Sequence, residues 1–397
     1  MKESDFTATK GRLISSEDGS YQSFVPAYLP INLDYNTDFV SLLEKASQKL
    51  GELKTLSVGL DSSIGFAPQL FIKPYLRQEA VLSSRIENTI STLYDVLEAE
   101  ALGPDKLQSK DESLRGDLFE VLNYVRAQNV GIEMIENGSA INIDLITRLH
   151  SILLRNVRGE RAKPGLLRDK QNWISRGGFP DIKDAVYVPP PANLVPELLN
   201  NLFNYMESSD DPQLIKIALM HYQFEAIHPF WDGNGRIGRL LIIMYLIKRG
   251  LLTYPFLYMS DYFERNRELY YNLLMSISKN GAYEEWIKFF LIGIIEQSDS
   301  VINKTRALLS YYSEIRKKLG NTREGVAMKL ADYIFTHPVI TIPNVARDLD
   351  VSYPAIKKAV VKFIDLGILE KNNNRATSTS KKPMIFIAPE IIEKYEA

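Results

Sequence analysis

A histidine, an acid, a Gly-Asn-Gly turn and two arginines are crowded into residues 228–239, HPFWDGNGRIGR. Gly233-Asn234-Gly235 gives the backbone freedom for positive φ and for the close approach of a ligand. Successive N–H groups at the head of a helix form a concave site for anions. Arg236 and Arg239 follow three residues apart, so they project from one helix face about one turn apart.

Two arginines at a helix start need a reason, because each opposes the helix dipole at a cost of about 0.3–1 kcal/mol. A bound di- or triphosphate makes this arrangement favourable, since each charge-assisted hydrogen bond to it contributes about 1.5–3 kcal/mol of stabilisation. Arg236 and Arg239 are therefore predicted to form a phosphate clamp.

Two further side chains add acid–base and metal chemistry to this clamp. One carboxylate plus phosphate oxygens is the usual way a protein holds Mg²⁺, which predicts a magnesium ion at Asp232. His228 is the only nearby group that takes a proton near neutral pH. Together these residues predict transfer of a phosphate-containing group to a hydroxyl.

Other interpretations of the stretch explain less of it. A Walker P-loop needs GxxxxGK[ST], and no such lysine or hydroxyl follows here. A zinc site needs three or four ligands, which His228 and Asp232 leave incomplete. A glycine-rich turn into a helix with surface arginines accounts for Gly-Asn-Gly, but not for the histidine, aspartate and arginines around it.

The elements that must position this loop are predicted to be mainly helices. In QEAVLSSRIENTISTLYDVLEAE the residues Ile86, Ile90, Leu93 and Leu97 stand at helical spacing and predict one long amphipathic helix. ALGPDKLQSKDE at 101–112 breaks the pattern. Further helices are expected at 113–135, 142–155, 192–207, 212–226 and 234–249, and then through 310.

Two segments differ from this helical pattern. Residues 158–191 are rich in Gly and Pro, with short strands QNWI and AVYV, and predict a β-hairpin outside the helical body. Such a long Gly- and Pro-rich loop is often functional. Residues 1–37 are polar and are expected to wrap the surface.

The last part of the chain predicts a separate unit. TIPNVARDLDVSYPAIKKAVVKFIDLGILEK indicates helix, tight turn and helix, with Ser352 as N-cap and Pro354 in the first turn. Two short strands around a polar loop follow, which is the order of a winged helix-turn-helix. Its second helix carries Lys357, Lys358 and Lys362, but Asp348, Asp350 and Asp365 dilute this patch. Protein contacts are favoured here, with DNA binding as the alternative.

Composition narrows the class of protein. The chain has 397 residues, 45% hydrophobic and 24% charged, and a formal net charge of −2, so no global field draws it to nucleic acid or membranes. Cysteine is absent, which excludes disulfides and thiolate metal sites. The apolar run LLIIMYLI is too short to span a bilayer, and the polar N-terminus lacks a signal-peptide pattern. We expect a cytoplasmic protein without a membrane partner.

The loop residues resemble a known family. HPFWDGNGRIGR matches the signature of Fic (Fido-domain) proteins, His-Pro-Phe-x-Asp/Glu-Gly-Asn-Gly-Arg-x-x-Arg, at every defined position. The resemblance covers roughly residues 140–295. It implies a mainly α fold, a Fic/Fido helical core with a β-hairpin flap and a C-terminal winged helix-turn-helix. The expected units are an N-terminal helical region at 1–139, the core at 140–297, a helical linker at 298–320 and the winged helix at 321–397.

The resemblance implies transfer of AMP from ATP to a Ser, Thr or Tyr hydroxyl of a protein, with pyrophosphate leaving. His228 would be the general base and Asp232 would hold Mg²⁺. Arg236 would contact the β- and γ-phosphates, and Arg239 would orient the γ-phosphate. The rest of the nucleotide-binding loop would be Pro229, Phe230 as a buried anchor, Trp231 in a packing or target-contact role, and the amides of Gly233, Asn234 and Gly235.

It also implies the surroundings of that loop. The flap around Tyr187 and Val188 would align a target segment as an added strand. Asn266 falls where relatives contact the nucleoside. Family members often pair through the core, so a homodimer is a further expectation.

SSRIEN at 83–88 resembles the family's inhibitory motif Ser/Thr-x-x-x-Glu-Gly/Asn through Ser83, Glu87 and Asn88. In relatives this glutamate pairs with the second motif arginine, here Arg239, and displaces the γ-phosphate. The resemblance therefore implies an autoinhibited enzyme. The alternative is a DNA-binding regulator whose Fic core acts mainly as a nucleotide sensor.

Several remaining side chains are expected to be structural. His221 beside Phe224 favours a core histidine, and Trp286, Tyr270 and Tyr271 are expected in the core rather than at a nucleotide platform. Arg168 and Trp173 are expected to brace the base of the flap.

Overall fold

The computed structural model describes residues 6–7, 10–63, 69–103, 112–157, 163–175, 181–320, 325–372 and 383–396. Helices dominate this part of the chain, as predicted. The strands form two small antiparallel sheets. One pairs β1 (Arg12–Ser15) with β2 (Gln22–Val25), and the other has the order β3 (Val339–Thr341), β5 (Ile385–Ile387), β4 (Glu370–Lys371).

Two apolar helices form the centre of the core. They are α7 (Gln213–Ile227) and α8 (Asn234–Lys248), both buried on almost every side, as expected for helices enclosed by others. The predicted helix at 234–249 is thereby confirmed, and the loop between α7 and α8 is the HPFWDG stretch. Around them pack helices α4 (Glu112–Glu136), α5 (Ile143–Leu153), α6 (Val195–Ser208) and α10 (Arg267–Asn280), with the short α9 (Ser260–Arg265) nearby.

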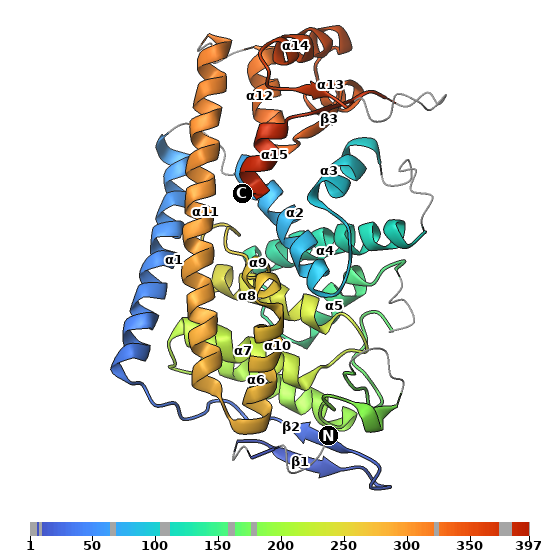
Figure 1. The fold of residues 1–397 in the computed structure, drawn as a ribbon, viewed down its shortest axis with the longest axis vertical. Coiled ribbons are helices and arrows are strands. Elements are labelled where there is room, and N and C mark those ends of the chain that lie inside the picture. Colours follow the sequence, from blue (N-terminus) through green and yellow to red (C-terminus); the bar gives the residue numbers. More distant parts are fainter. Residues whose placement is uncertain are drawn as a thin grey trace.

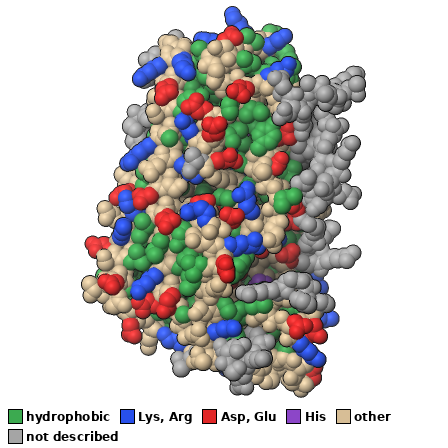
Figure 2. Space-filling model, viewed as in Figure 1, with side chains coloured by type: hydrophobic (Ala, Val, Ile, Leu, Met, Phe, Trp, Pro, Cys, Tyr) green, Lys and Arg blue, Asp and Glu red, His purple; other side chains and the backbone are tan. Residues whose placement is uncertain are grey.

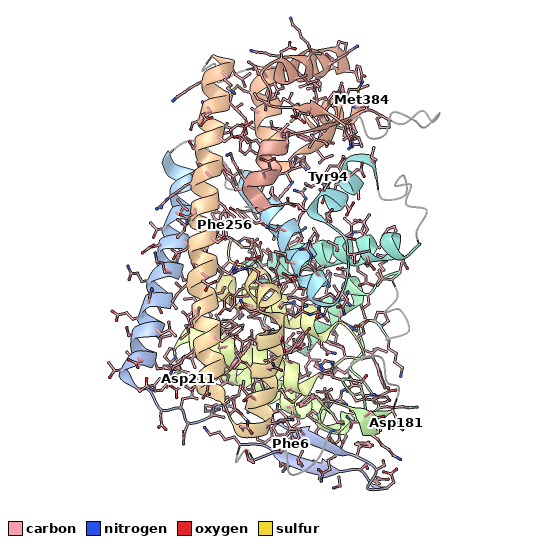
Figure 3. The ribbon with its side chains drawn as sticks, viewed as in Figure 1. Phe6, Tyr94, Asp181, Asp211, Phe256 and Met384 are labelled. Carbon is pink, nitrogen blue, oxygen red and sulfur yellow. The ribbon has the colours of Figure 1, made fainter. Side chains whose placement is uncertain are left out.

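One long helix connects the core to the C-terminal unit. α11 (Tyr283–Leu319) has 37 residues and lies beside α1 (Thr37–Ser63) along one side of the molecule (Figure 1). The expected boundary between residues 297 and 298 falls inside this helix. The end of the predicted core and the predicted helical linker therefore belong to one continuous helix. Phe256, labelled in Figure 3, is buried, and its ring packs against that of Tyr75 with the ring centroids 5.9 Å apart.

The single long helix predicted across QEAVLSSRIENTISTLYDVLEAE, residues 78–100, is wrong. α2 (Gln69–Ile86) ends before Glu87, and α3 (Leu93–Leu102) begins after Ser91-Thr92. Asn88 has a left-handed φ of 69°, and Thr92 with Asp95 forms a capping box that starts α3. Ile90, expected on the apolar face, is 63% exposed. The break places Glu87 at the end of a helix instead of on its side.

The C-terminal unit packs directly on α2, the helix that precedes Glu87, and on α3, which follows it. It comprises α12 (Val326–Thr336), β3, α13 (Ile342–Asp348), α14 (Tyr353–Asp365), β4, β5 and α15 (Pro389–Glu396). Buried Arg77 of α2 donates to the Thr336 carbonyl at 2.6 Å and pairs with Glu100 at 2.7 Å. Ser352 is the N-cap residue of α14 as predicted, although its side chain makes no capping hydrogen bond.

The N-terminal segment and the flap meet at the other end of the molecule. Residues 1–37 were expected only to wrap the surface, but they include the β1–β2 hairpin, and Phe24 N donates to the Val188 carbonyl at 2.9 Å. Of the predicted flap hairpin, the described residues form one antiparallel bridge between Ile174 and Tyr187, while 158–162 and 176–180 lie outside the described residues. Two 3-10 turns, Ile182–Asp184 and Ala192–Leu194, complete this region.

On the face shown in Figure 2, acidic and basic side chains are interspersed among the coloured residues, in keeping with the net charge of −2. Within the described ranges, no helix combines the length and the apolar character needed to cross a membrane.

Candidate active site

The loop between α7 and α8 is stabilised by hydrogen bonds between its own residues. His228 has a left-handed φ of 49° at the end of α7, and Gly233 has φ of 76° at the start of α8. The Asn234 side chain accepts from Phe230 N at 2.8 Å and donates to Phe230 O at 2.9 Å, while the Phe230 ring is fully buried. The N–H groups of the first turn of α8 have no acceptor within the helix and are left to bind an anion.

Three side chains from distant segments hold the loop from outside. The His150 ring stacks on Phe230 at 3.9 Å. Its Nδ1 accepts from Gly165 N at 2.9 Å, which leaves Nε2 to donate to the Asp232 carbonyl at 3.0 Å. Buried Arg168 donates to the His228 carbonyl at 2.9 Å and to that of Pro190, so it braces the loop and the flap base as expected. Asn172 donates to Phe230 O at 2.9 Å.

His228 is a neutral side chain at the edge of a cavity, and its pKa lies below the near-neutral range expected from the sequence. Its ring lines a cavity of about 810 Å³. Burial, helped by the Arg168 guanidinium, lowers the pKa of His228 to about 4, so the ring is neutral at physiological pH. Nδ1 lies 3.3 Å from the Glu225 carbonyl, which assigns the ring proton to Nδ1 and leaves the Nε2 lone pair available.

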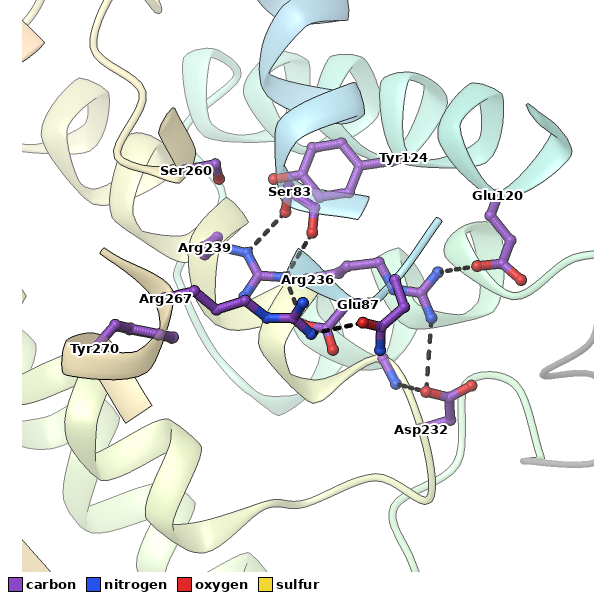
Figure 4. A network of polar contacts seen from close by, with 12 residues as sticks. Ser83, Glu87, Glu120, Tyr124, Asp232, Arg236, Arg239, Ser260, Arg267 and Tyr270 are labelled. Atoms are coloured by element: carbon purple, nitrogen blue, oxygen red, sulfur yellow. Dashed lines mark hydrogen bonds and ion pairs between the residues drawn. The ribbon is translucent and has the colours of Figure 1, made fainter. Parts of the chain in front are cut away.

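Arg236 is compensated by two carboxylates. It is buried, donates to Glu120 Oε2 at 3.1 Å, and lies 3.6 Å from Asp232 Oδ1 (Figure 4). Asp232 Oδ1 also accepts from Gly233 N at 2.6 Å, and the Asp232 side chain is half exposed beside the anion cradle. Its exposed oxygen fits a magnesium ion shared with phosphate oxygens. No set of three or more His, Cys, Asp or Glu in the described ranges could hold a metal by protein ligands alone.

Arg239 is compensated by the SSRIEN segment. Its guanidinium donates to Glu87 Oε1 at 2.7 Å, to Ser83 Oγ at 2.8 Å and to Ser83 O at 3.0 Å (Figure 4). Burial raises the pKa of Glu87, but the attraction of Arg239 outweighs it and the net pKa lies below the usual range. Glu87 therefore stays ionised against Arg239.

The tip of this segment is also fixed. Asn88 Oδ1 accepts from Arg267 of α10 at 2.9 Å. A side chain at Gly235 would collide with Glu87 Oε1 and stand 2.9 Å from Arg239 Nη1, so the glycine allows the pair to form over the helix start.

The cavity extends from His228, Gly235 and Arg239 to α10 and the flap. Tyr271 lines it and is 41% exposed, so its expected core position is wrong. Tyr270 is buried and bonds His221 Nε2 at 2.8 Å. His221 and Trp286 are fully buried, which confirms both as core residues.

Two predicted contacts of the cavity need correction. Asn266 does not line it, because its side-chain amide turns back to donate to the Tyr262 carbonyl at 2.9 Å at the end of α9. Val188 is fully buried and its carbonyl already accepts from Phe24, so it offers no carbonyl to a target strand. Tyr187 lines the cavity, with its hydroxyl donating to Ala226 O at 2.8 Å.

Among the rest of the predicted set, Pro229 is buried in the loop and Trp231 is partly exposed beside it. Neither lines the cavity, whereas exposed Trp173 of the flap does. Sequence reasoning missed Glu120, His150 and Glu225. Glu120 and His150 lie far from the motif in the sequence. Glu225 lies close to it, but no neighbouring residue suggests an interaction for its carboxyl. No local pattern therefore pointed to any of the three.

Glu79, behind this site, provides a prediction about stability. It is buried, and its Oε1 accepts from Tyr124 and Ser260, while Oε2 has no hydrogen-bond partner among the described residues. Burial raises its pKa to about 7, so between the ordinary pKa and 7 the folded protein retains a proton that the unfolded chain has lost. Stability then falls as pH rises. We expect Glu79→Gln to stabilise the protein by up to about 3 kcal/mol at pH 8 and by little at pH 5.

Thermal melts at the two pH values measure this difference. Glu133→Gln on the exposed side of α4 is the matched control and should show none. An equal Glu79→Gln effect at both pH values would contradict the assigned pKa.

Two family models match the chain. The Fic/DOC family model matches residues 140–246, and the Fic/DOC family N-terminal model matches residues 40–133, together about half of the chain. The matched ranges contain the whole 228–239 loop and the SSRIEN segment.

Curated relatives share parts of the same region. A probable protein adenylyltransferase of Aquifex aeolicus is 38% identical over 91 residues, 23% of this chain and 26% of that protein. Protein adenylyltransferase Fic of Nematostella vectensis is 29% identical over 217 residues, 53% of this chain and 45% of that protein. The chain thus spans less than half the length of these relatives.

Solved structures share the fold. A Fic family protein from Desulfovibrio desulfuricans superposes with a TM-score of 0.57 at 20% identity, covering 91% of this chain and 98% of that one. Fic-1 of Caenorhabditis elegans superposes with a TM-score of 0.51 at 17% identity, covering 68% of this chain and 75% of that one.

Proposed function

The chain belongs to the Fic/DOC family, and from that premise we propose that it is a protein adenylyltransferase that moves AMP from ATP to a hydroxyl of a protein. One observation carries the proposal. A neutral histidine, the unpartnered first-turn N–H groups of a buried helix and a buried arginine meet at one end of a single cavity. The names of the curated relatives support the same activity.

The residues present account for each part of the reaction. His228 Nε2 takes the proton of the target hydroxyl, whose oxygen attacks the α-phosphorus. The bond from the α-phosphorus to the oxygen bridging it to the β-phosphorus breaks, and pyrophosphate leaves. The amides of Asn234 and Gly235 and the Arg236 guanidinium stabilise the negative charge on the leaving group. Magnesium, held by Asp232 and phosphate oxygens, would neutralise part of that charge.

We propose in addition that the arrangement of Glu87 is inhibitory. Arg239 is predicted to bind the γ-phosphate, yet its donors are taken by Glu87 and Ser83. A nucleotide that enters while this pair persists lacks its γ-phosphate contact. The contact of Arg267 with Asn88 and the docking of the C-terminal unit on α2 support the same closed position.

The C-terminal unit is proposed to be a winged helix-turn-helix that contacts protein. The exposed side of α14 carries Lys357, Lys358 and Lys362, but also the exposed apolar residues Tyr353, Val361 and Ile364. Such residues suit a protein contact better than the reading of base edges, which needs polar side chains.

Labelled ATP tests the proposed activity against its competitors. With a protein acceptor, label at the α-phosphate should be retained on protein and label at the γ-phosphate should not. Retention of the γ label would indicate kinase chemistry. Retention of neither label, together with DNA binding that weakens steeply with salt, would favour the DNA-binding regulator instead.

A further inference from the structure

The C-terminal unit docks on the two helices that flank residues 87–92, the segment that carries Glu87. α12 and α15 pack on α2, and β3 packs on α3 (Figure 1). We propose that this docking holds Glu87 on Arg239, so that loosening the C-terminal unit raises AMP transfer. The inference rests on the proposed function, because it assigns a control to the proposed inhibitory contact.

α2 connects the docked C-terminal unit with Arg239. In the first half of α2 the ring of Tyr75 packs against that of Tyr395 of α15, with the ring centroids 5.3 Å apart. At the end of α2, Ser83 accepts two hydrogen bonds from Arg239, through Oγ at 2.8 Å and through its carbonyl at 3.0 Å. Ser83 lies only about 12 Å beyond Tyr75 along the axis of the same helix. A shift of the docked turns therefore moves the acceptors of Arg239.

α3 fastens the other end of the segment to the same unit. Asn344 Nδ2 of α13 donates to the Ala101 carbonyl at 2.6 Å. Asn372 Nδ2, directly after β4, donates to the Tyr94 hydroxyl at 2.6 Å. Because only residues 87–92 separate α2 from α3, the position of this segment depends on how the C-terminal unit holds both helices.

Arg77 joins α2, α3 and the C-terminal unit. It is buried, its Nε donates to Glu100 Oε1 of α3 at 3.0 Å, and its Nη2 lies 2.7 Å from Glu100 Oε2. Its Nη1 donates at 2.6 Å to the carbonyl of Thr336, the last residue of α12. Removing one partner of a buried ion pair leaves the other charge uncompensated, so loss of Arg77 should loosen this interface. Its hydrogen bonds are directed to Glu100 and Thr336, so an effect of Arg77 on transfer passes through the positions of α2 and α3.

The docking interface is incompletely packed. A cavity of about 360 Å³ lies within it, between Leu76 and Arg77 of α2, Leu97 of α3, and Ile340 and Asn344 of the C-terminal unit. Side chains that border a cavity lack part of the contacts of a closely packed interior. Contacts made only in the docked arrangement stabilise the inhibited state, and their loss shifts the equilibrium toward the active state.

AMP transfer by the full chain tests the inference in a two-by-two comparison of Arg77→Ala and Glu87→Gly. We expect Arg77→Ala alone to raise transfer about fivefold or more, in the usual range of coupling between distant sites. In the Glu87→Gly background it should give no further increase, because the contact that it controls is gone. Arg77→Lys keeps the charge but not the paired hydrogen bonds, so its increase should be smaller. Arg249→Ala is the matched control, since Arg249 also binds a carboxylate, that of Glu207, and a carbonyl, that of Met206, and it should leave transfer unchanged.

Hydrogen exchange of the same variants reports on the segment without any transfer. The amides of residues 87–89 donate to carbonyls in the last turn of α2. Arg77→Ala should speed the exchange of these amides about fivefold or more and leave α7 and α8 unchanged. Asn344→Ala removes a single hydrogen bond of the interface, so it perturbs folding less and should change both measurements in the same direction.

Equal stimulation by Arg77→Ala with and without Glu87 would overturn the inference, because it would not act through the inhibitory contact. Unchanged exchange at residues 87–89 in both Arg77→Ala and Asn344→Ala would overturn it as well. Failure of the proposed activity is distinguishable. Transfer that rises with Glu87→Gly but not with Arg77→Ala rejects this inference alone, whereas faster exchange with no retained α label in any variant rejects the proposed activity alone.

Discussion

Replacing Glu87 by glycine is expected to raise the rate of AMP transfer by about ten- to a hundredfold. The reason is the pair between Glu87 Oε1 and Arg239 Nη2 at 2.7 Å, which keeps the buried guanidinium from the γ-phosphate. Without Glu87, Arg239 gains a charge-assisted hydrogen bond to the triphosphate instead. Incorporation of α-labelled AMP into protein measures the change.

Two related substitutions sharpen this prediction. Glu87→Gln keeps the size of the side chain but removes its charge, so we expect an increase smaller than that of Glu87→Gly. Ser83→Ala removes one of the Arg239 contacts and leaves the ion pair, so it should change transfer least. Equal rates for the wild-type chain and Glu87→Gly would reject the inhibitory role of this segment.

His228→Ala in the Glu87→Gly background is expected to lower transfer by about 10²–10⁴-fold, the usual contribution of a positioned general base. The affinity for ATP should change little, because the first-turn N–H groups and both arginines remain. Single-turnover rates and calorimetric titration separate these two quantities. His337→Ala in the C-terminal unit is the matched control, since burial also lowers the pKa of that histidine to about 4.

The pKa of His228 also predicts a pH dependence. Because it is lowered to about 4, the base is already neutral at pH 6, and His228 should impose no loss of transfer between pH 8 and pH 6. Loss of transfer through this residue should begin only as the pH approaches its pKa and the ring becomes protonated.

Unimpaired transfer by the His228→Ala variant would show that another group takes the proton.

The loop and its helix could be predicted because their signals are local. The Gly-Asn-Gly turn, the two arginines and the apolar run after them specify the start and the burial of α8 within a few residues. The positive charge of Arg236 and Arg239 predicted negatively charged partners, and both side chains pair with carboxylates. The identity of the anion beside Arg236 was not predictable, because Glu120 precedes it by more than a hundred residues and reaches it only through the packing of α4 on α8.

The region around Glu87 shows a different limit. Apolar spacing through 86–97 suggested one helix, but the hydrogen bonds between Thr92 and Asp95 start a new one and leave Asn88 in a left-handed conformation. A Thr followed three residues later by an acid is a local signal that could have been used. Asn266 and Tyr271 were misplaced because the sequence showed neither the break between α9 and α10, where Asn266 stands, nor which side of α10 faces the cavity.

The most direct test is a crystal structure of the Glu87→Gly variant with Mg²⁺ and an ATP analogue whose α- and β-phosphorus atoms are joined by a methylene group. The triphosphate should rest on the first-turn N–H groups of α8, with the γ-phosphate against Arg239 and the α-phosphorus facing His228 Nε2. A triphosphate bound elsewhere, with this helix start left without it, would contradict the central claim.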